Sequence, residues 1–273
     1  MSFEYYVESE NRIYLCSGRG RLKRNGEIYI GDRVEFAANG ADYTIEKVLP
    51  RENCLIRPYI ANIDLAVVVI SVKPQPDFVM VDKVLVNCIE KGIRPLLCVN
   101  KTDLGKGEYE SVCRQYPDFD KICVSALTGE GVEELRAILR GKIACLAGQS
   151  AVGKTSLVNF LTGENLETGE MSKIDRGRNT TRHNEFYRLD ENTYLADTCG
   201  FSLIELDVPS RELKDFYPEF DRFRGSCRFS DCRHTAERDC AVKQAVESGR
   251  IARERYDRYV TIYNELVKKE ERK

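Results

Sequence analysis

The stretch GQSAVGKT, residues 148–155, combines the residue types and the spacing of a phosphate-binding loop. Its two glycines, Gly148 and Gly153, let the backbone curl so that N–H groups point at phosphate oxygens, and the helix that follows adds a partial positive charge. We predict that Lys154 bridges the β- and γ-phosphates and that Thr155 offers its hydroxyl to Mg²⁺. The predicted phosphate-binding residues are Gly148, Gln149, Ser150, Ala151, Val152, Gly153, Lys154, Thr155 and Ser156.

The stretch VNKTD, residues 99–103, is typical of guanine recognition. The carboxylate of Asp103 can accept hydrogen bonds from the two donors on the guanine edge, whereas adenine offers no matching pair, so this contact excludes ATP. Asn100 and Lys101 are expected to brace the loop and the base plane. Ser125-Ala126, which ends the apolar run KICVSA, suits a backbone N–H bond to guanine O6. The predicted base-binding residues are Asn100, Lys101, Thr102, Asp103, Ser125 and Ala126.

The polar segments that follow the phosphate-binding loop contain the predicted catalytic residues. In DTCG, the carboxylate of Asp197 is placed to hold Mg²⁺ through water, and the N–H of Gly200 can reach the γ-phosphate. In the polar loop before DTCG, either Thr180 or Thr181 is expected to be the switch threonine that closes on Mg²⁺ when a γ-phosphate is present. His183 beside them either polarises water or is an ordinary surface residue.

The order of these elements is unusual, because the base-recognition stretch precedes the phosphate-binding loop. In a doubly wound sheet the functional loops meet at the carboxyl ends of the strands whatever their order. A circular permutation preserves such a site when the old termini were close together. We therefore predict a circularly permuted P-loop GTPase domain. Its switch segments lead directly into the C-terminal part of the chain, so that the nucleotide state can move that part.

The segment CRFSDCRHTAERDC, residues 227–240, predicts a metal centre. Its spacing, C-x4-C-x-H-x5-C, offers three thiolates and an imidazole from Cys227, Cys232, His234 and Cys240. Four such ligands close a tetrahedral Zn²⁺ site with no open position, so we expect one structural Zn²⁺. A small polar helical domain also lacks the apolar residues for a core and needs such a staple. Free cysteines or a redox pair are the alternatives.

The composition is ordinary for a soluble globular protein, with 42% hydrophobic and 32% charged residues. Because the formal net charge is −2, RNA binding would need local basic patches such as the segment from Arg12 to Arg33, which a solvated strand face explains equally well. No apolar run reaches membrane-spanning length and the N-terminus lacks a secretion signal, so we expect a cytoplasmic protein without membrane association. Most of the 11 cysteines stand singly in apolar runs, which indicates buried, reduced thiols.

The apolar pattern divides the chain into three predicted domains. Residues 1–57 alternate in short β-type runs, which fits an oligonucleotide-binding (OB-fold) β-barrel or another small barrel. Residues 58–207 alternate strand and helix patterns, which predicts an α/β domain with a parallel sheet. Residues 208–273 lack strand patterns and predict a small helical zinc-binding domain. In the central domain we expect strands at 63–71, 94–100, 121–126, 142–148 and 192–198, and helices at 78–91, 131–139 and 153–161.

Together these motifs resemble the RsgA family of small ribosomal subunit-dependent GTPases. The resemblance extends over essentially the whole chain and is carried by NKTDL, GQSAVGKTSL, GRNTT, DTCGF and, most specifically, CRFSDCRHTAERDCAVKQAVESGRI. It implies an OB-fold N-terminal domain, a circularly permuted GTPase domain and a C-terminal zinc domain. It also implies binding of GTP and GDP, binding to the 30S subunit and its 16S rRNA near the decoding region, and hydrolysis stimulated by the 30S particle.

The sequence departs from the family pattern at several positions. Ala151 replaces a glycine of the phosphate-binding loop, which is harmless if its φ is negative and strained otherwise, and Thr155 replaces a serine but keeps the hydroxyl. Asn179 stands where the family has a histidine implicated in catalysis, and an amide cannot accept a proton from water. Cys199 stands where proline is common. In addition, Phe201 follows DTCG where many GTPases place a water-orienting glutamine, so intrinsic hydrolysis should be slow.

The interpretation that accounts for most of these motifs is a monomeric, GTP-hydrolysing assembly factor for late maturation of the 30S subunit. Two alternatives stay open. One is an RNA-binding module whose GTP pocket turns over little, because Asn179 and Phe201 weaken the case for catalysis. The other is a GTPase that acts on another RNA or protein partner.

Overall fold

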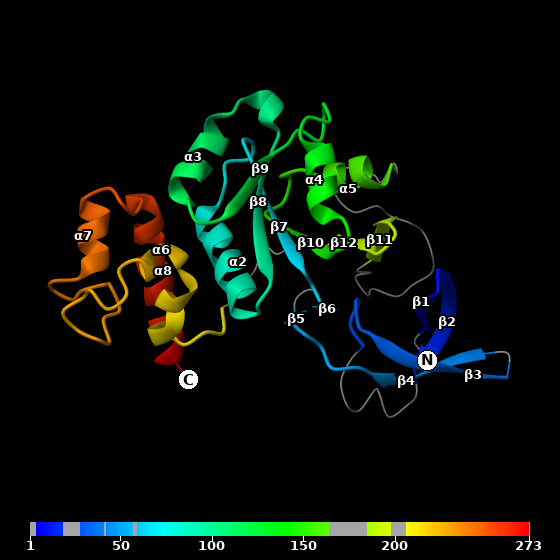
Figure 1. Cartoon of the computed structure of the whole chain (residues 1–273). Helices are drawn as coiled ribbons and strands as arrows, with labels where there is room; N and C mark the ends of the chain where they lie inside the picture. The colour runs from blue at the N-terminus through cyan, green and yellow to red at the C-terminus, as the bar shows by residue number, and fades with distance from the viewer. Residues whose placement is uncertain are drawn as a thin grey trace. The chain divides into compact units, whose positions relative to one another are not determined.

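The computed structural model describes residues 4–18, 28–40, 42–56, 59–163, 185–197 and 206–272 (Figure 1). The chain divides into two compact units, residues 1–63 and residues 64–273. The central and C-terminal parts of the sequence therefore belong to the same unit. Within the described residues, the helices are all too short or too polar to cross a membrane.

The N-terminal unit is built from β-strands, as the alternating runs predict. Its four-stranded sheet has the order β1-β2-β4-β3, with a parallel pair, β2–β4, between two antiparallel pairs. Glu10 and Asn11 make the turn between β1 and β2 with φ angles of 50° and 61°, a left-handed conformation that suits a tight hairpin. The strands are β1 (Glu4–Ser9), β2 (Arg12–Gly18), β3 (Val34–Asn39) and β4 (Asp42–Val48), followed by an antiparallel pair, β5 (Cys54–Ile56) and β6 (Tyr59–Ala61).

A six-stranded sheet forms the centre of the second unit, in the order β11-β12-β10-β7-β8-β9. Neighbouring strands are parallel except for β11, which runs antiparallel to β12. Every residue of β7 is buried, which is why LAVVVIS is a continuous apolar run and does not alternate. The strands are β7 (Leu65–Ser71), β8 (Arg94–Asn100), β9 (Asp120–Cys123), β10 (Ile143–Ala147), β11 (Glu185–Asp190) and β12 (Thr193–Asp197).

Helices cover both faces of this sheet (Figure 1). α4 and α5 pack on one face, where Val132, Leu135 and Leu139 form an apolar stripe at helical spacing. α2 and α3 lie on the other side. α2 begins after Asp77, whose carboxylate accepts a hydrogen bond of 3.0 Å from the N–H of Met80 and so caps the helix. The helices are α2 (Phe78–Glu90), α3 (Gly107–Gln115), α4 (Val132–Leu139) and α5 (Lys154–Thr162), with a 3-10 turn, η1 (Thr102–Leu104).

The C-terminal segment is helical and packs on α2. Its buried cluster of aromatic and aliphatic side chains, which includes Tyr217, Phe220 and Tyr259, also contains Val86 of α2. The long helix α8 runs beside α2 (Figure 1). The segment contains η2 (Ser210–Phe216), α6 (Pro218–Asp221), α7 (Ala241–Glu247) and α8 (Arg253–Glu270).

The structure confirms the predicted α/β class and the predicted central strands and helices, whose bounds differ from the prediction by at most three residues. α3 and β11 were not predicted. In α3 only Val112 and Gln115 are buried, so its apolar stripe is too short to show a helical period. β11 is an edge strand of mixed polarity and its pattern is correspondingly weak. The domain boundaries after residues 57 and 207 stay predictions.

Candidate functional site

The sheet brings together the two nucleotide motifs that the chain order separates. β7 pairs with β10 on one side and with β8 on the other, and β8 also pairs with β9. Because these four strands are parallel, their carboxyl ends lie at the same edge of the sheet. Residues 99–103 run from the end of β8 into η1, residues 125–126 follow β9, and residues 148–155 form the loop after β10 and the start of α5. These three stretches therefore meet at one edge, as expected for a nucleotide site.

The phosphate-binding loop has the backbone that its glycines predict. Gly148 has a φ of 143° and Gly153 a φ of 96°, both in the region that favours glycine. A Cβ at Gly148 would lie 2.3 Å from the carbonyl oxygen of Val69, and one at Gly153 would lie 2.4 Å from Nδ2 of Asn100. Side chains are therefore excluded at both positions. The ammonium group of Lys154, the first residue of α5, donates hydrogen bonds to the carbonyls of Gly148 (2.9 Å) and Gln149 (2.8 Å), which places it over the loop.

The base-recognition stretch is bonded directly to the phosphate-binding loop. Asn100, only 1% exposed, donates from Nδ2 to the carbonyl of Val152 at 2.9 Å. Lys101 donates from Nζ to the carbonyl of Ala151 and to that of Lys73, each at 2.7 Å. Two side chains of NKTD thus bond the base-recognition stretch to consecutive residues of the phosphate-binding loop, and their role toward the base plane stays a prediction.

The carboxylate of Asp103 is exposed and held in place by Ser125. Ser125 donates from Oγ to Oδ1 of Asp103 at 2.6 Å. Thr102 is buried and donates from Oγ1 to the carbonyl of Val124 at 3.0 Å, which fixes the loop on the end of β9. The N–H of Ala126 donates to Oδ1 of Asn100 at 3.0 Å, so its predicted contact with guanine O6 stays a prediction. An accessible, oriented carboxylate beside a glycine cradle fits a guanine nucleotide.

Ala151 adopts the strained conformation that the sequence left open. Its φ is 63°, in the left-handed region that residues with a Cβ rarely adopt. The remaining predicted loop residues, Ser150, Thr155 and Ser156, are exposed or half-buried, and the last two lie in the first turn of α5.

The switch residues lie mostly outside the described residues. Thr180, Thr181, His183 and Gly200 belong to this group, as do the departures Asn179, Cys199 and Phe201. Asp197 is the last residue of β12, which pairs in parallel with β10. Its backbone therefore lies at the same edge of the sheet as the phosphate-binding loop. The catalytic roles of these residues stay predictions.

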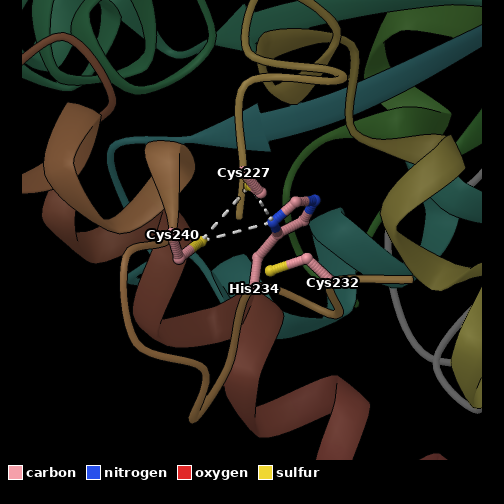
Figure 2. Close-up of side chains that lie close together, drawn as sticks. All are labelled: Cys227, Cys232, His234 and Cys240. Carbon is pink, nitrogen blue, oxygen red and sulfur yellow. Dashed lines mark hydrogen bonds between the residues drawn. The ribbon is translucent and has the colours of Figure 1, made fainter. Parts of the chain in front are cut away.

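The four predicted metal ligands converge on one point (Figure 2). Their ligand atoms, three Sγ and a ring nitrogen of His234, all lie within 4.8 Å of one another. Nδ1 of His234 lies 3.6 Å from Sγ of Cys227 and 3.4 Å from Sγ of Cys240, and these two sulfur atoms are 3.9 Å apart. Zn–S bonds of about 2.3 Å and Zn–N bonds of about 2.0 Å give tetrahedral edges of about 3.5–3.8 Å. The three separations among Cys227, His234 and Cys240 therefore fit the edges of a tetrahedral zinc site, and Sγ of Cys232 lies within 4.8 Å of the other ligand atoms.

The loop around these ligands is ordered by its own hydrogen bonds. The carboxylate of Glu237 accepts from the N–H groups of Arg233 (2.8 Å) and Thr235 (2.9 Å), which flank His234. His234 itself has a φ of 59°, and this left-handed residue turns the C-x-H segment sharply enough for both of its ligands to face the same point. The N–H of Ala241 donates to Sγ of Cys227 at 3.3 Å, a contact that stabilises a thiolate.

Burial disfavours the charged forms of the Cys232 and Cys240 thiols and of the His234 imidazole when no metal is bound. It raises the pKa of the Cys232 thiol to about 12 and raises the pKa of Cys240, because the thiolates lose hydration. Burial likewise lowers the pKa of His234, which keeps the imidazole neutral as metal binding requires. Three thiols and one imidazole packed together with only Cys227 partly exposed are best explained as ligands of one cation. The distance between the Cys227 and Cys240 sulfurs excludes a disulfide between them.

Comparison with known proteins identifies the family. The RsgA GTPase family model matches residues 48–207. The small ribosomal subunit biogenesis GTPase RsgA of Caldanaerobacter subterraneus is 42% identical over 277 residues, covering 98% of this chain and 94% of that protein. This chain belongs to the RsgA GTPase family. RsgA of Moorella thermoacetica is 40% identical and covers 97% of this chain and 94% of its own length.

Solved structures of similar proteins agree with the assignment to the RsgA GTPase family. The crystal structure of YjeQ from Thermotoga maritima superposes with a TM-score of 0.83 at 35% identity, covering 97% of this chain and 94% of that one. YloQ, described as a circularly permuted GTPase, gives a TM-score of 0.78 at 31% identity, with coverages of 97% and 92%. The chain is therefore a GTP-hydrolysing enzyme with a circularly permuted GTPase fold, and both sequence predictions are confirmed.

The structure also places residues near the site that the motifs did not predict. The loop 73–77 contacts both nucleotide motifs. The carbonyl of Lys73 accepts from Lys101 of the base-recognition stretch, and the backbone N–H of Asp77 donates to Gln149 of the phosphate-binding loop. An Asp directly before an apolar helical run predicts a helix cap, so the position of Asp77 could have been found from the sequence. Its contact with the phosphate-binding loop could not, because the two segments are 72 residues apart.

Proposed function

We propose that this chain is a GTP-hydrolysing assembly factor that acts in late maturation of the small (30S) ribosomal subunit. The supporting observation is its likeness, over nearly its whole length, to proteins named small ribosomal subunit biogenesis GTPase. The base-recognition stretch bonded to the phosphate-binding loop supports guanine nucleotides as its ligands. Hydrolysis is expected to be slow alone and fast on the 30S particle.

In the proposed mechanism, the backbone N–H groups of residues 148–153 and the helix dipole of α5 hold the α- and β-phosphates. Lys154, already positioned over the loop by two carbonyls, contacts the β- and γ-phosphates. Thr155 and Asp197 are the residues that would hold Mg²⁺, which when bound neutralises charge on the β- and γ-phosphate oxygens. Thr180 or Thr181 and the N–H of Gly200 respond to the γ-phosphate, and His183 is the candidate for orienting water.

Guanine specificity is assigned to the opposite side of the site. Asp103 accepts from N1 and N2 of the base, and the hydrogen bond from Ser125 fixes its orientation before binding. The N–H of Ala126, which here donates to Oδ1 of Asn100, would exchange that bond for one to O6. The aliphatic stem of Lys101 covers the base plane while its ammonium group holds the phosphate-binding loop. An adenine in this position would leave the carboxylate without donors, which costs more than one hydrogen bond.

The remaining parts are assigned structural and RNA-binding roles. One Zn²⁺ held by Cys227, Cys232, His234 and Cys240 closes the C-terminal segment, and it has no open position for chemistry. We divide the chain into an OB-fold domain (1–57), a permuted GTPase domain (58–207) and a helical zinc domain (208–273). The first and last are proposed to bind 16S rRNA. The protein is expected to be cytoplasmic, monomeric and free of membranes.

The deciding experiment measures GTP turnover by the purified protein alone, with 30S subunits and with 50S subunits. Stimulation by 30S alone supports the assembly GTPase. Equal stimulation by both subunits would favour a GTPase with another partner. Tight 30S binding in the presence of a GTP analogue, without stimulation, would favour an RNA-binding module. The specific observation behind that last alternative is the presence of Asn179 and Phe201 where relatives and other GTPases use a histidine and a glutamine.

A further inference from the structure

The side-chain amide of Gln149 joins the phosphate-binding loop to the loop before α2. Its Oε1 accepts a hydrogen bond of 2.8 Å from the N–H of Asp77, and its Nε2 donates to the carbonyl of Gln75 at 3.0 Å. Lys101 holds the same loop from the base-recognition side, through the carbonyl of Lys73 at 2.7 Å. Loop 73–77 is therefore bonded to both nucleotide motifs without itself belonging to either.

Loop 73–77 is continuous with α2. Asp77 receives the bond from Gln149 with its backbone and caps α2 with its carboxylate. A displacement of α2 along its axis must therefore move the residue that Gln149 contacts. Asp82 lies in the second turn of the same helix, and its side chain is completely buried. A buried carboxylate must be paired, and the positively charged partners of Asp82 come from the C-terminal segment.

Two arginines of α8 supply these partners. Arg255 places Nη1 2.6 Å from Oδ1 of Asp82 and Nε 2.7 Å from Oε1 of Glu219 in α6. Arg258 donates from Nε to Oδ2 of Asp82 at 2.7 Å. The side chain of Arg255 is 1% exposed and that of Arg258 is 12% exposed. The two carboxylates of Asp82 and Glu219 thus hold two guanidinium groups in an interior where water does not screen them.

The guanidinium group of Arg258 forms hydrogen bonds with residues of α2 and of the end of α3. Besides Asp82, it donates from Nη1 to Oε1 of Gln115 at 2.8 Å and from Nη2 to the hydroxyl of Tyr116 at 3.1 Å. Tyr116 in turn donates to Oδ1 of Asp82. The guanidinium group of one α8 residue is therefore bonded to α2 and to the end of α3. This is a directional, planar contact and not only apolar packing.

We propose that Gln149 is a positioning residue which ties the phosphate-binding loop to α2, and that the buried Asp82 cluster extends this tie to α8 of the zinc-binding segment. The chain of contacts runs from Gln149 through Asp77 and α2 to Asp82, and from there to Arg255 and Arg258. A partner that displaces α8 changes the affinity of the phosphate-binding loop for nucleotide. By reciprocity, bound nucleotide changes the affinity of α8 for that partner by the same coupling free energy. The inference rests on nucleotide binding at this loop, which is part of the proposed function.

A double-mutant cycle tests the tie. The variants are Gln149→Met, which keeps the length of the side chain and removes its amide, and Arg258→Met, which leaves Asp82 paired with Arg255. The readouts are the dissociation constant of fluorescent mant-GDP, and KM and kcat for GTP. Arg222→Met is the matched control, because Arg222 forms an exposed ion pair with Asp118 that also joins the C-terminal segment to the GTPase part. Zinc content and circular dichroism confirm that each variant is folded.

We expect Gln149→Met to weaken mant-GDP binding about tenfold, because two hydrogen bonds are lost. Arg258→Met should weaken binding about threefold in the parent chain and have almost no further effect in the Gln149→Met background. Arg258→Lys, which keeps a positive charge next to the carboxylate of Asp82, should restore part of the affinity for mant-GDP. Arg222→Met should bind like the parent.

Three results would overturn the inference. The first is a folded Arg258→Met variant with parent affinity. The second is a double variant whose dissociation constant rises by the product of the two single-variant factors, because Gln149 and Arg258 would then act on nucleotide binding independently. The third is an Arg222→Met effect as large as that of Arg258→Met. Failure of the unmodified chain to bind mant-GDP would overturn the proposed function and this inference together, whereas the other results leave the proposed function standing.

Discussion

Replacing Ala151 by glycine should stabilise the protein. Ala151 has a φ of 63°, and a residue with a Cβ pays about 1–2 kcal/mol for a left-handed conformation. Glycine removes that strain but loses about 0.5–1 kcal/mol more conformational entropy on folding. The free energy of unfolding should therefore rise, by about 0.75 kcal/mol at the middle of these ranges and by about 0–1.5 kcal/mol across them. The contact with Lys101 is not lost in the variant, because it uses the carbonyl of Ala151.

Urea and thermal unfolding measure this difference directly. For a unit of this size, about 1 kcal/mol corresponds to about 2–4 °C in Tm, so the Ala151→Gly variant should melt about 1–4 °C higher. Ala137→Gly is the matched control, because Ala137 is an exposed residue within α4 and the same chemical change there should cost about 1 kcal/mol. If Ala151→Gly destabilised the protein as much as Ala137→Gly does, the assignment of a strained loop would be refuted.

Three further predictions concern the metal, the base and the buried thiols. Cys240→Ser should abolish stoichiometric zinc, measured by metal analysis, and should lower Tm far more than Cys113→Ser, which lies outside the cluster. Asp103→Asn should weaken GTP binding roughly 100-fold in a competition assay, since two bonds to a charged acceptor are lost, and parent-like affinity would exclude Asp103 from the base site. Burial raises the pKa of both Cys98 and Cys145 to about 12, so the native protein releases their protons later than the unfolded chain does. The free energy of unfolding should therefore fall as pH rises from about 9 to 12, and neither thiol should react with iodoacetamide at pH 8 unless denaturant is present.

The sequence was sufficient where spacing alone determines the chemistry. The glycines at 148 and 153 lie where a Cβ would collide with Val69 and Asn100, so the glycine spacing of the motif directly reflects the backbone that the loop adopts. The four predicted metal ligands are a second example, because a spacing of a few residues already limits where four side chains can meet. The spacing could not reveal the backbone conformation that lets these side chains meet, which is the left-handed φ of His234 in the C-x-H segment.

The buried ionic cluster lay beyond sequence reasoning. Asp82 stands in the run FVMVDKVLV, where a charged residue is ordinarily a solvent-facing helix position. Its burial depends on arginines that arrive with α8, and no periodicity in α2 indicates them. The same reason hides the role of Gln149, whose backbone belongs to a recognised motif while its amide bonds a loop 72 residues earlier. Local patterns predicted the elements, whereas contacts between distant elements required the fold.

The separation between Asp82 and Arg258, 176 residues along the chain, has a consequence for synthesis. Translation is vectorial, so α2 and the base-recognition strand emerge first, the phosphate-binding loop follows, and α8 emerges last. Until then Asp82 is a carboxylate without its two guanidinium partners. The nascent chain can assemble its central sheet early, but it completes the support of α2 only when the final helix docks. A fragment that ends before α8 should therefore be a substrate for chaperones and proteases.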